Sequence, residues 1–279
     1  MPELPEVETI VRALRQGGRN GPPVVEKILA NVQVLWARSI SSPAVSEFQE
    51  RIRGQVVEHV YRRGKFICLK LDRDTLLVHL RMSGDLRVEI PKNENGQPRK
   101  VEPHDRVVFE FADGSWMVFN DARKFGRIWL AAEPQQVIEG LGPEPLDPTF
   151  GWEDLYQRLQ STHRQLKPLL LDQGFLAGLG NIYTDESLYS ARLHPSRSAN
   201  SLSKDEAERL LAAIRAVLEE GIRRNGASID WVYRGGNFQN YFRVYQRTGQ
   251  PCVECGSLIQ RRVVGQRSTH FCPVCQLES

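Results

Sequence analysis

Four cysteines near the C-terminus have the spacing of a metal site. Cys252 and Cys255 form one Cys-x-x-Cys pair, and Cys272 and Cys275 form a second pair after 16 intervening residues. Two such pairs are typical of zinc sites, because each tight turn presents two thiolates and two turns complete a tetrahedron around Zn²⁺. Four sulfur ligands leave no open position, so the pattern predicts one structural zinc ion. The alternative is a pair of redox-active dithiols.

The N-terminal residues Pro2 and Glu3 combine a potential nucleophile with an acid. If Met1 is removed, Pro2 has a secondary amine at the chain terminus. Such an amine has a pKa of about 8, against about 10.4 for lysine, so more of it is neutral at neutral pH. Amines form Schiff bases with carbonyl carbons, and a proline iminium is already cationic. Taken alone, the spacing favours a simpler interpretation, in which Pro2 merely precedes a helix. The alternative for Glu3 is a charge that complements the helix N-terminus, a role that suits Glu8 better.

The whole chain has the composition of an ordinary globular protein. It has 279 residues, with 41% hydrophobic and 25% charged side chains and a net charge of +3. These values exclude disorder over the whole chain, and the length suits about two domains. No apolar run approaches the ~18 residues that span a bilayer, and the acidic N-terminus does not have the features of a secretory signal. We therefore expect a cytoplasmic protein without a membrane partner, in which structural disulfides are rare.

Positive charge is concentrated at the C-terminal end of the chain. From Gly221 onward there are eight arginines, no lysine and three acidic residues, which leaves a net charge of −2 on the first 220 residues. A basic end favours binding to a polyanion, although a solvated basic face on an unrelated protein has the same composition. Between the cysteine pairs, a predicted β-hairpin would present some of its basic residues to a partner. The basic residues between the pairs are Arg261, Arg262, Arg267 and His270.

The first half of the chain predicts a β-rich domain that follows one helix. Apolar residues from Val7 to Leu14 recur at i, i+3, i+4 and i+7, which predicts a helix over residues 5–16. Short β-rich segments follow, bounded by Gly and Asp turns, and their close spacing predicts an antiparallel sandwich or barrel. The segments are 56–61, 66–71, 76–82, 106–111, 116–120 and 127–130, with a long polar loop over 92–104.

The composition changes after residue 133. Prolines and glycines accumulate over 134–151, which predicts a linker between an N-terminal domain, 1–133, and a helical domain, 152–226. Within the helical domain, Ser203-x-x-Glu206 is a capping box that opens a long helix. Other expected helices cover 152–159, 168–173 and 181–189. Residues 227–279 form a final segment of loop and short strands around the cysteines.

Several motifs occur together in an order that is typical of one enzyme family. The N-terminal MPELPEVET is followed by Arg63-Gly64-Lys65, by Gly-Leu-Gly-Asn-Ile-Tyr over 178–183 and by the four cysteines. In this combination the chain resembles bacterial formamidopyrimidine-DNA glycosylases, which repair oxidised purines, over essentially its whole length. The resemblance implies a multidomain α+β fold. An N-terminal antiparallel β-sandwich with flanking helices would be followed by a helix–two-turn–helix domain, a lesion-capping loop and a four-cysteine zinc finger.

The resemblance assigns catalytic roles to four residues, namely Pro2, Glu3, Lys65 and Arg267. It implies that Pro2 attacks C1′ of a flipped, oxidised nucleotide and that strand cleavage follows by β- and δ-elimination. Glu3 would assist sugar-ring opening and proton transfer. Lys65 would lie near the lesion phosphate, and Arg267 would grip a phosphate from the zinc hairpin.

The resemblance also implies residues that contact duplex DNA. Met82, Arg123 and Phe125 match the family's void-filling trio, in which apolar wedges and an arginine occupy the space left by the flipped base. Asn181 lies at a glycine-rich helix entry whose backbone N–H groups could bind an anion. The remaining expected contacts are His79, His104, Arg164 and Lys167.

Other functions remain open on the sequence alone. An endonuclease VIII-type enzyme for oxidised pyrimidines has a similar layout, but Leu4 favours the formamidopyrimidine branch. A non-catalytic DNA-binding homologue would not need Pro2 and Lys65, and an RNA-binding zinc ribbon leaves the β-rich half unexplained. The expected capping loop is shorter than in better-known members of the family, and it contains the aromatic residues Trp231 and Tyr233. Both features bear on the preference between 8-oxoguanine and ring-opened purines. We expect the protein to act as a monomer.

Overall fold

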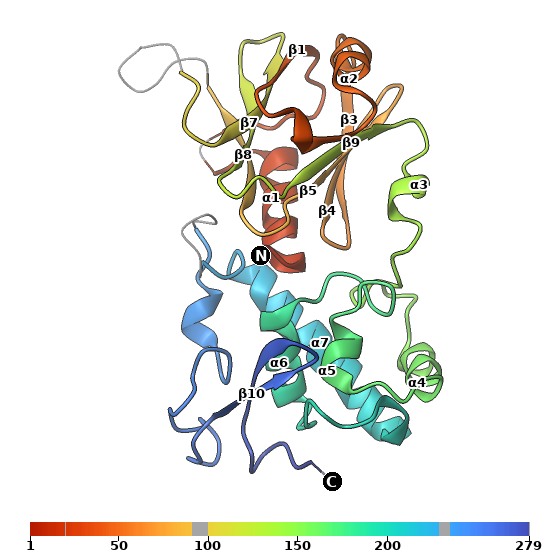
Figure 1. Cartoon of the computed structure of the whole chain (residues 1–279), viewed down its shortest axis with the longest axis vertical. Coiled ribbons are helices and arrows are strands. Elements are labelled where there is room, and N and C mark those ends of the chain that lie inside the picture. The colour runs from red at the N-terminus through yellow and green to blue at the C-terminus, as the bar shows by residue number, and fades with distance from the viewer. Residues whose placement is uncertain (20, 91–99, 229–234, 279) are drawn as a thin grey trace. The chain divides into compact units, whose positions relative to one another are not determined.

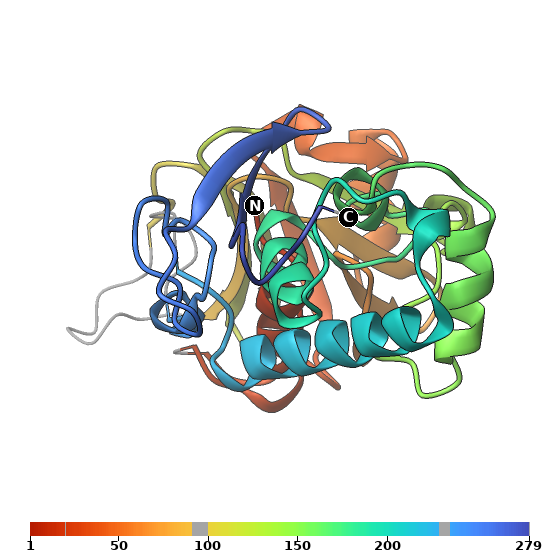
Figure 2. The ribbon, with the colours of Figure 1, turned by 90° about the horizontal axis from the view of Figure 1, so that it is seen from below.

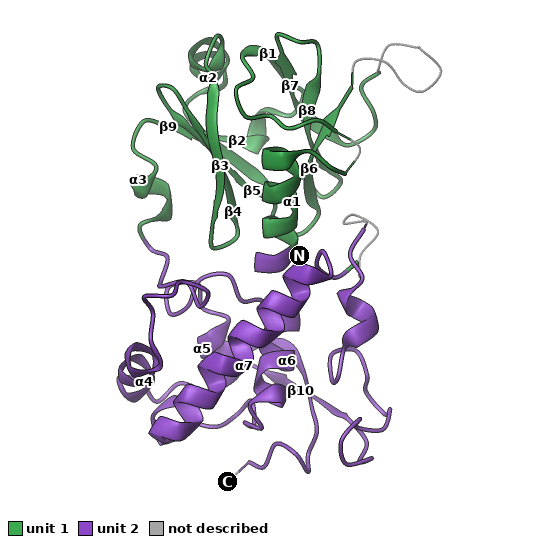
Figure 3. Cartoon of the chain, turned by 180° about the vertical axis from the view of Figure 1, so that it is seen from behind, with its two compact units in different colours: residues 1–2, 6–139, 228–234 green, residues 3–5, 140–227, 235–279 purple. Residues whose placement is uncertain are grey.

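The computed structural model describes residues 1–19, 21–90, 100–228 and 235–278. These residues form two compact units, coloured green and purple in Figure 3. Among the described residues, unit 1 contains 1–2, 6–139 and 228, and unit 2 contains 3–5, 140–227 and 235–278. Trp231 and Tyr233 of the expected capping loop lie outside the described residues.

Unit 1 is built on two β-sheets (Figure 1). The first has the order β1 (Leu29–Val34), β7 (Asp105–Phe111), β8 (Trp116–Asp121) and β6 (Gly84–Glu89), and every neighbouring pair is antiparallel. The second has the order β2 (Ile40–Ser42), β9 (Arg127–Ala131), β5 (Thr75–His79), β4 (Phe66–Leu71) and β3 (Val57–Arg63). Its strands are antiparallel except for the parallel pair β2–β9. The predicted N-terminal sandwich is therefore confirmed, with one parallel pair that the sequence pattern did not indicate.

Helix α1 (Leu4–Gln16) places its apolar stripe in the core of unit 1. The residues from Val7 to Leu14 at helical spacing are buried in one cluster with side chains of both sheets. Helix α2 (Val45–Ile52) adds Phe48 and Ile52 to this cluster. Burial of each such side chain stabilises the fold by about 1.5–3 kcal/mol. The short elements η1 (Ala37–Ser39) and α3 (Gln135–Ile138) complete the unit.

Strand β5 ends earlier than predicted. It stops at His79, whereas the sequence pattern extended it to Met82. The reason is the backbone of Arg81, whose φ of 54° lies in the left-handed region and cannot continue an extended strand. Met82 therefore lies on a turn between β5 and β6.

Unit 2 is mainly helical. Its helices are α4 (Trp152–Gln160), α5 (Leu166–Leu170), α6 (Asn181–Ser190) and α7 (Lys204–Arg223), with short turns η2 (Ala199–Ser201) and η3 (Phe238–Tyr241). The long helix α7 packs against α4 and α6 (Figure 2). Its start confirms the capping box, because Ser203 Oγ accepts from the Glu206 N–H at 3.2 Å and Glu206 accepts from the Ser203 N–H at 2.9 Å. None of the described helices combines the length and hydropathy needed to span a bilayer.

The strands β10 (Gln260–Val264) and β11 (Arg267–Phe271) form the predicted C-terminal hairpin. Its tip packs tightly on α5, since a Cβ on Gly265 would lie 2.8 Å from Cβ of Pro168. His270 is 6% exposed, so it is not among the basic residues that the hairpin presents. Its backbone N–H instead donates to Asp185 of α6 at 3.0 Å.

Candidate active site

Glu3 is held by the N-terminus of α6 within unit 2. Its carboxylate accepts hydrogen bonds from the backbone N–H groups of Gly180 at 2.7 Å, Ile182 at 3.0 Å and Tyr183 at 3.3 Å. The side chain is almost completely buried, at 2% exposure. Amide donors and the positive end of the helix dipole both stabilise a carboxylate there. Glu3 therefore has a fixed position, immediately after Pro2 in the chain.

The glycine-rich entry to α6 makes this contact possible. A Cβ on Gly180 would lie 2.3 Å from Cδ of Glu3, and a Cβ on Gly178 would lie 2.5 Å from Cδ1 of Leu4. Glu3 thus occupies three of the backbone amides that were expected to be available to an anion at this helix entry, and a phosphate contact here would rely on the amide groups of Asn181. The Asn181 side chain donates to the Ser268 carbonyl at 3.0 Å, which joins the helix entry to the zinc hairpin.

Pro2 and Lys65 are both buried side chains of unit 1. Pro2 follows an exposed Met1, and its nitrogen is part of a peptide bond while Met1 is present. Amine chemistry at Pro2 therefore requires removal of Met1. Lys65 lies with Gly64 in the tight turn between β3 and β4, where Gly64 has a φ of 55°. Burial of Lys65 is unusual for a turn lysine, which is ordinarily solvated.

His79 at the end of β5 is a neutral imidazole. Burial and the positive charges of Arg81 and Lys65 lower the pKa of His79 to about 3. The Nδ1 atom accepts from the backbone N–H of Arg81 at 3.1 Å, so the neutral ring carries its proton on Nε2. The ring also packs edge-on against Phe66, with centroids 4.8 Å apart. His79 therefore offers one hydrogen-bond donor and no charge.

The neutral state of His79 predicts how stability depends on pH. The unfolded chain takes up a proton near pH 6.5, whereas the folded chain does so only near pH 3. The free energy of unfolding should therefore fall as the pH falls through this window, by up to about 1.4 kcal/mol per pH unit. His79→Gln should give a shallower slope in urea unfolding between pH 6.5 and pH 4.5. The exposed His59 provides the control, and a His79→Gln slope equal to that of His59→Gln would contradict the assignment.

Met82, Arg123 and Phe125 lie on two loops of unit 1 that are hydrogen-bonded to each other. The Phe125 ring is 49% exposed, and the Arg123 guanidinium lies 5.1 Å from its centroid. The backbone N–H of Arg123 donates to the hydroxyl of Ser83 at 3.1 Å, directly beside the half-buried Met82. Phe125 is thus exposed, as a void-filling role requires, and the sequence did not indicate the part that Ser83 takes.

His104 borders the same pair of loops. Its backbone carbonyl accepts from the N–H of Asp121 at 2.9 Å, and its ring Nδ1 lies 3.2 Å from the Arg106 guanidinium. The residue is exposed and has a φ of 77°. His79 is therefore buried and His104 is exposed, but both lie beside loops that carry expected DNA contacts.

Arg164 and Lys167 of unit 2 have different environments. The Arg164 guanidinium is half-exposed and pairs with Asp172 at 2.7 Å. Lys167 is fully buried, where its ammonium pairs with the Asp185 carboxylate and donates to the Asn181 carbonyl at 3.1 Å. The expected surface contact of Lys167 with a phosphate is therefore corrected, because its ammonium is not accessible.

Asp185 attaches the zinc hairpin to the helices of unit 2. Besides Lys167, its carboxylate accepts from the backbone N–H of His270 and lies 3.1 Å from Nδ1 of that residue. Arg267 lies at the start of β11, on the exposed edge of the same hairpin. No local pattern in the sequence distinguishes Asp185, yet this carboxylate helps to place the hairpin that carries Arg267.

The four cysteine sulfurs converge in unit 2, all within 4.8 Å of one another. The Cys252–Cys275 and Cys255–Cys272 sulfurs are 3.9 Å and 3.5 Å apart. Tetrahedral Zn–S bonds of about 2.3 Å place sulfurs about 3.8 Å apart, so the cluster fits a zinc ion. The Tyr189 hydroxyl lies 3.1 Å from Cys252 Sγ and supports that ligand from outside the cluster.

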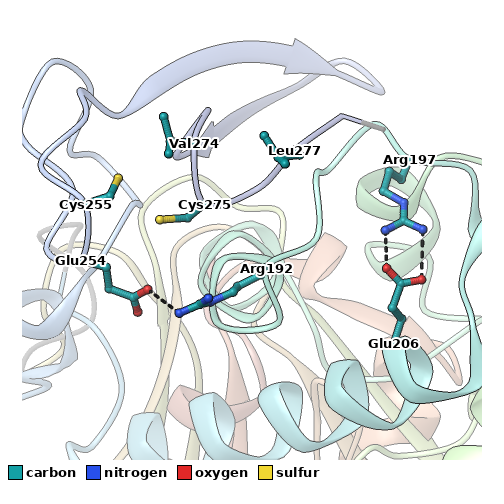
Figure 4. Close-up of a pocket in the computed structure, with 8 residues that line it drawn as sticks. All are labelled: Arg192, Arg197, Glu206, Glu254, Cys255, Val274, Cys275 and Leu277. Carbon is teal, nitrogen blue, oxygen red and sulfur yellow. Dashed lines mark hydrogen bonds and ion pairs between the residues drawn. The ribbon is translucent and has the colours of Figure 1, made fainter.

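A pocket of about 550 Å³ opens beside this cluster (Figure 4). Its two arginines are neutralised by its own acids, since Arg192 pairs with Glu254 at 3.3 Å and Arg197 forms a two-pronged pair with Glu206. The complete lining is Arg192, Arg197, Glu206, Glu254, Cys255, Val274, Cys275 and Leu277. The expected catalytic and DNA-contacting residues do not line it, so this pocket is separate from the candidate site.

Models of three protein families match consecutive parts of the chain. The formamidopyrimidine-DNA glycosylase N-terminal domain matches residues 1–128, the H2TH domain of the same enzymes matches 141–232, and a zinc finger found in FPG and IleRS matches 249–277. The chain is 43% identical to the formamidopyrimidine-DNA glycosylase of Pelotomaculum thermopropionicum, over 99% of both chains. It is 42% identical to that of Cytobacillus firmus, over 99% of this chain and all of the relative.

Solved structures of a relative agree with this similarity. The Lactococcus lactis Fpg in complex with abasic-site DNA aligns with a TM-score of 0.88 and 33% identity, over 99% of this chain and all of that one. The same enzyme in complex with Fapy-dG DNA aligns with a TM-score of 0.87 and the same identity and coverage. The matched models, the identities along the full length and the shared fold establish that this chain belongs to the formamidopyrimidine-DNA glycosylase family.

Proposed function

We propose that the protein is a bifunctional DNA glycosylase and abasic-site lyase that removes oxidised purines, such as 8-oxoguanine and formamidopyrimidines, from duplex DNA. It acts as a monomer. The observation that carries this proposal is the position of Glu3, whose carboxylate is fixed by three backbone amides next to Pro2. A catalytic acid that must transfer protons at one sugar benefits from such a fixed position. The DNA complexes of the Lactococcus lactis enzyme support the substrate class.

The proposed reaction begins after Met1 has been removed. The Pro2 nitrogen forms a bond to C1′ as the glycosidic bond breaks, and the base leaves with a proton. Glu3 assists protonation of the ring oxygen when the sugar opens, which leaves a cationic iminium between Pro2 and C1′. The iminium withdraws electrons, so a proton is lost from C2′ and the 3′-phosphate leaves. A second elimination releases the 5′-phosphate, and Lys65 serves these proton transfers.

The remaining site residues bind DNA in this proposal. Met82, Arg123 and Phe125 fill the space left by the flipped base, and the neutral His79 donates a hydrogen bond. Phosphates are contacted by His104, Arg164, Asn181 and Arg267. Cys252, Cys255, Cys272 and Cys275 would hold Zn²⁺, which would contribute to the stability of the hairpin.

Borohydride trapping tests the proposal directly. The purified protein is incubated with a duplex that carries 8-oxoguanine opposite cytosine in the presence of sodium borohydride, and the product is weighed as an intact chain. We expect a covalent adduct on a chain that lacks Met1, because reduction fixes the iminium at the N-terminal amine. An adduct formed only with an oxidised-pyrimidine duplex would favour an endonuclease VIII-type specificity. Binding without an adduct on any lesion would favour a non-catalytic protein.

A further inference from the structure

We propose that Ser83 and Asp121 are positioning residues that join Met82 and the Arg123–Phe125 segment into one rigid wedge. The inference rests on the proposed function, because it concerns how the three side chains enter a duplex. Neither residue carries a group that would itself contact the lesion. Their part is to hold two loops, which come from different strand connections of unit 1, in a single arrangement.

Asp121 closes the loop that carries Arg123 and Phe125. Its side chain is completely buried at the end of β8. One carboxylate oxygen accepts from the backbone N–H of Arg123 at 3.2 Å, and the other accepts from the backbone N–H of Gly126 at 2.7 Å. A single carboxylate thus bonds to both ends of the loop, and bonds to a charged acceptor are stronger than neutral ones. The loop between these bonds is left exposed, with Phe125 at its tip.

Ser83 connects this loop to the turn that carries Met82. Its buried hydroxyl donates to the Asp121 carboxylate and accepts from the backbone N–H of Arg123 at 3.1 Å. The turn itself is closed by a hydrogen bond from the Gly84 N–H to the Leu80 carbonyl at 2.9 Å. The Ser83 hydroxyl therefore joins two elements that are otherwise separate along the chain, and it does so one residue from Met82.

Other contacts restrain the loop from its far side. The Lys124 ammonium lies 4.1 Å from the centroid of the Trp36 ring, and the Arg127 guanidinium donates to the carbonyls of Lys124 and Gly126 at 3.2 Å and 2.8 Å. A Cβ on Gly126 would lie 2.3 Å from the Phe119 ring, so only glycine allows the loop to pass there. Five of the seven residues from 121 to 127 therefore take part in the contacts that hold the loop, and the exceptions are Ala122 and Phe125.

A rigid wedge matters because opening a base step is unfavourable. Unstacking must be offset by contacts that the wedge makes once it is inserted. If the loop were mobile, the entropy lost in ordering it on insertion would cancel part of that gain. A preorganised loop avoids this loss. Loss of the Ser83 hydroxyl should therefore impair reactions that require insertion into a duplex and spare reactions that do not.

Ser83→Ala provides the test, with Ser115→Ala as the matched control. Ser115 is also a buried serine whose hydroxyl donates to an aspartate, Asp113, at 2.6 Å, but it lies at the opposite end of β8. Each variant is assayed for excision of 8-oxoguanine from a duplex and for cleavage of an abasic site in single-stranded DNA, which has no stack to open. A 2-aminopurine base opposite the lesion reports insertion by its fluorescence.

We expect Ser83→Ala to slow excision from the duplex about 10-fold or more and to reduce the fluorescence change, with single-strand cleavage within about twofold of wild type. Asp121→Asn, which keeps the shape but loses one acceptor, should show the same pattern. Duplex excision equal to that of Ser115→Ala, or an equal loss on both substrates, would overturn the inference while wild type remains active. A wild-type protein that neither excises nor cleaves would instead overturn the proposed function, and this inference with it.

Discussion

Replacing Pro2 with glycine is expected to lower both excision and borohydride trapping on a lesion duplex by at least about 100-fold. Glycine is also small, so removal of Met1 should leave an amine in both proteins. The difference is that Pro2 gives a secondary amine, whose condensation product is an iminium that is cationic without protonation. The primary amine of glycine gives a neutral imine that must first gain a proton, and it lacks the ring that fixes the nitrogen before Glu3. Single-turnover excision and intact mass measure the two effects.

The control for this variant is Pro22→Gly, the same substitution in the segment between α1 and β1. It should retain wild-type excision and trapping. If Pro2→Gly were trapped as fully as wild type, the nucleophile would have to be another amine. Lys65 would be the first candidate, because it is the other buried amine that the family resemblance places in the chemistry. Peptide mapping of the trapped adduct would identify the residue.

Features with a local signal could be predicted from the sequence. The apolar stripe of α1 lies within eight residues, the Ser203 capping box within four, and each cysteine pair within four, so periodicity or spacing alone indicates them. The capping box closes within its own helix, and the stripe is recognised from its spacing although it packs against both sheets. The confirmed sandwich and the confirmed hairpin follow from patterns of the same kind, because alternation and turn residues recur over short distances.

Contacts between distant polar residues could not be predicted in this way. Glu3 binds amides 177 to 180 residues away, and Asp185 binds His270 at a separation of 85. Acids and lysines of this type are common on protein surfaces, and no neighbouring residue distinguishes a buried one. Lys167 was expected at the surface as a phosphate contact for this reason. The early end of β5 has a similar cause, since arginine has no preference for the left-handed φ of Arg81.

Loss of the zinc site is expected to remove the C-terminal hairpin from the DNA interface. Cys272 is buried in the sulfur cluster, and Cys272→Ser should abolish binding of Zn²⁺. A structural zinc ion contributes about 10–16 kcal/mol to the folding of small zinc domains, which exceeds what the short β10–β11 pair could supply. With the hairpin unfolded, Arg267 is no longer positioned. The affinity for a lesion duplex should fall at least about 100-fold, and the slope of log affinity against log salt should become shallower.

Cys68→Ala is the matched control, because Cys68 is equally buried but lies in β4, outside the cluster. It should keep one zinc ion per chain by elemental analysis and bind the duplex as wild type does. The hydrogen bonds of Asp185 with His270 attach one end of the hairpin to α6 independently of the metal, and Lys167 of α5 neutralises the Asp185 carboxylate. These contacts set how much structure survives in Cys272→Ser. A variant that lost zinc but kept wild-type affinity and salt dependence would show that these contacts suffice, and the metal would then have no part in placing Arg267 against a phosphate.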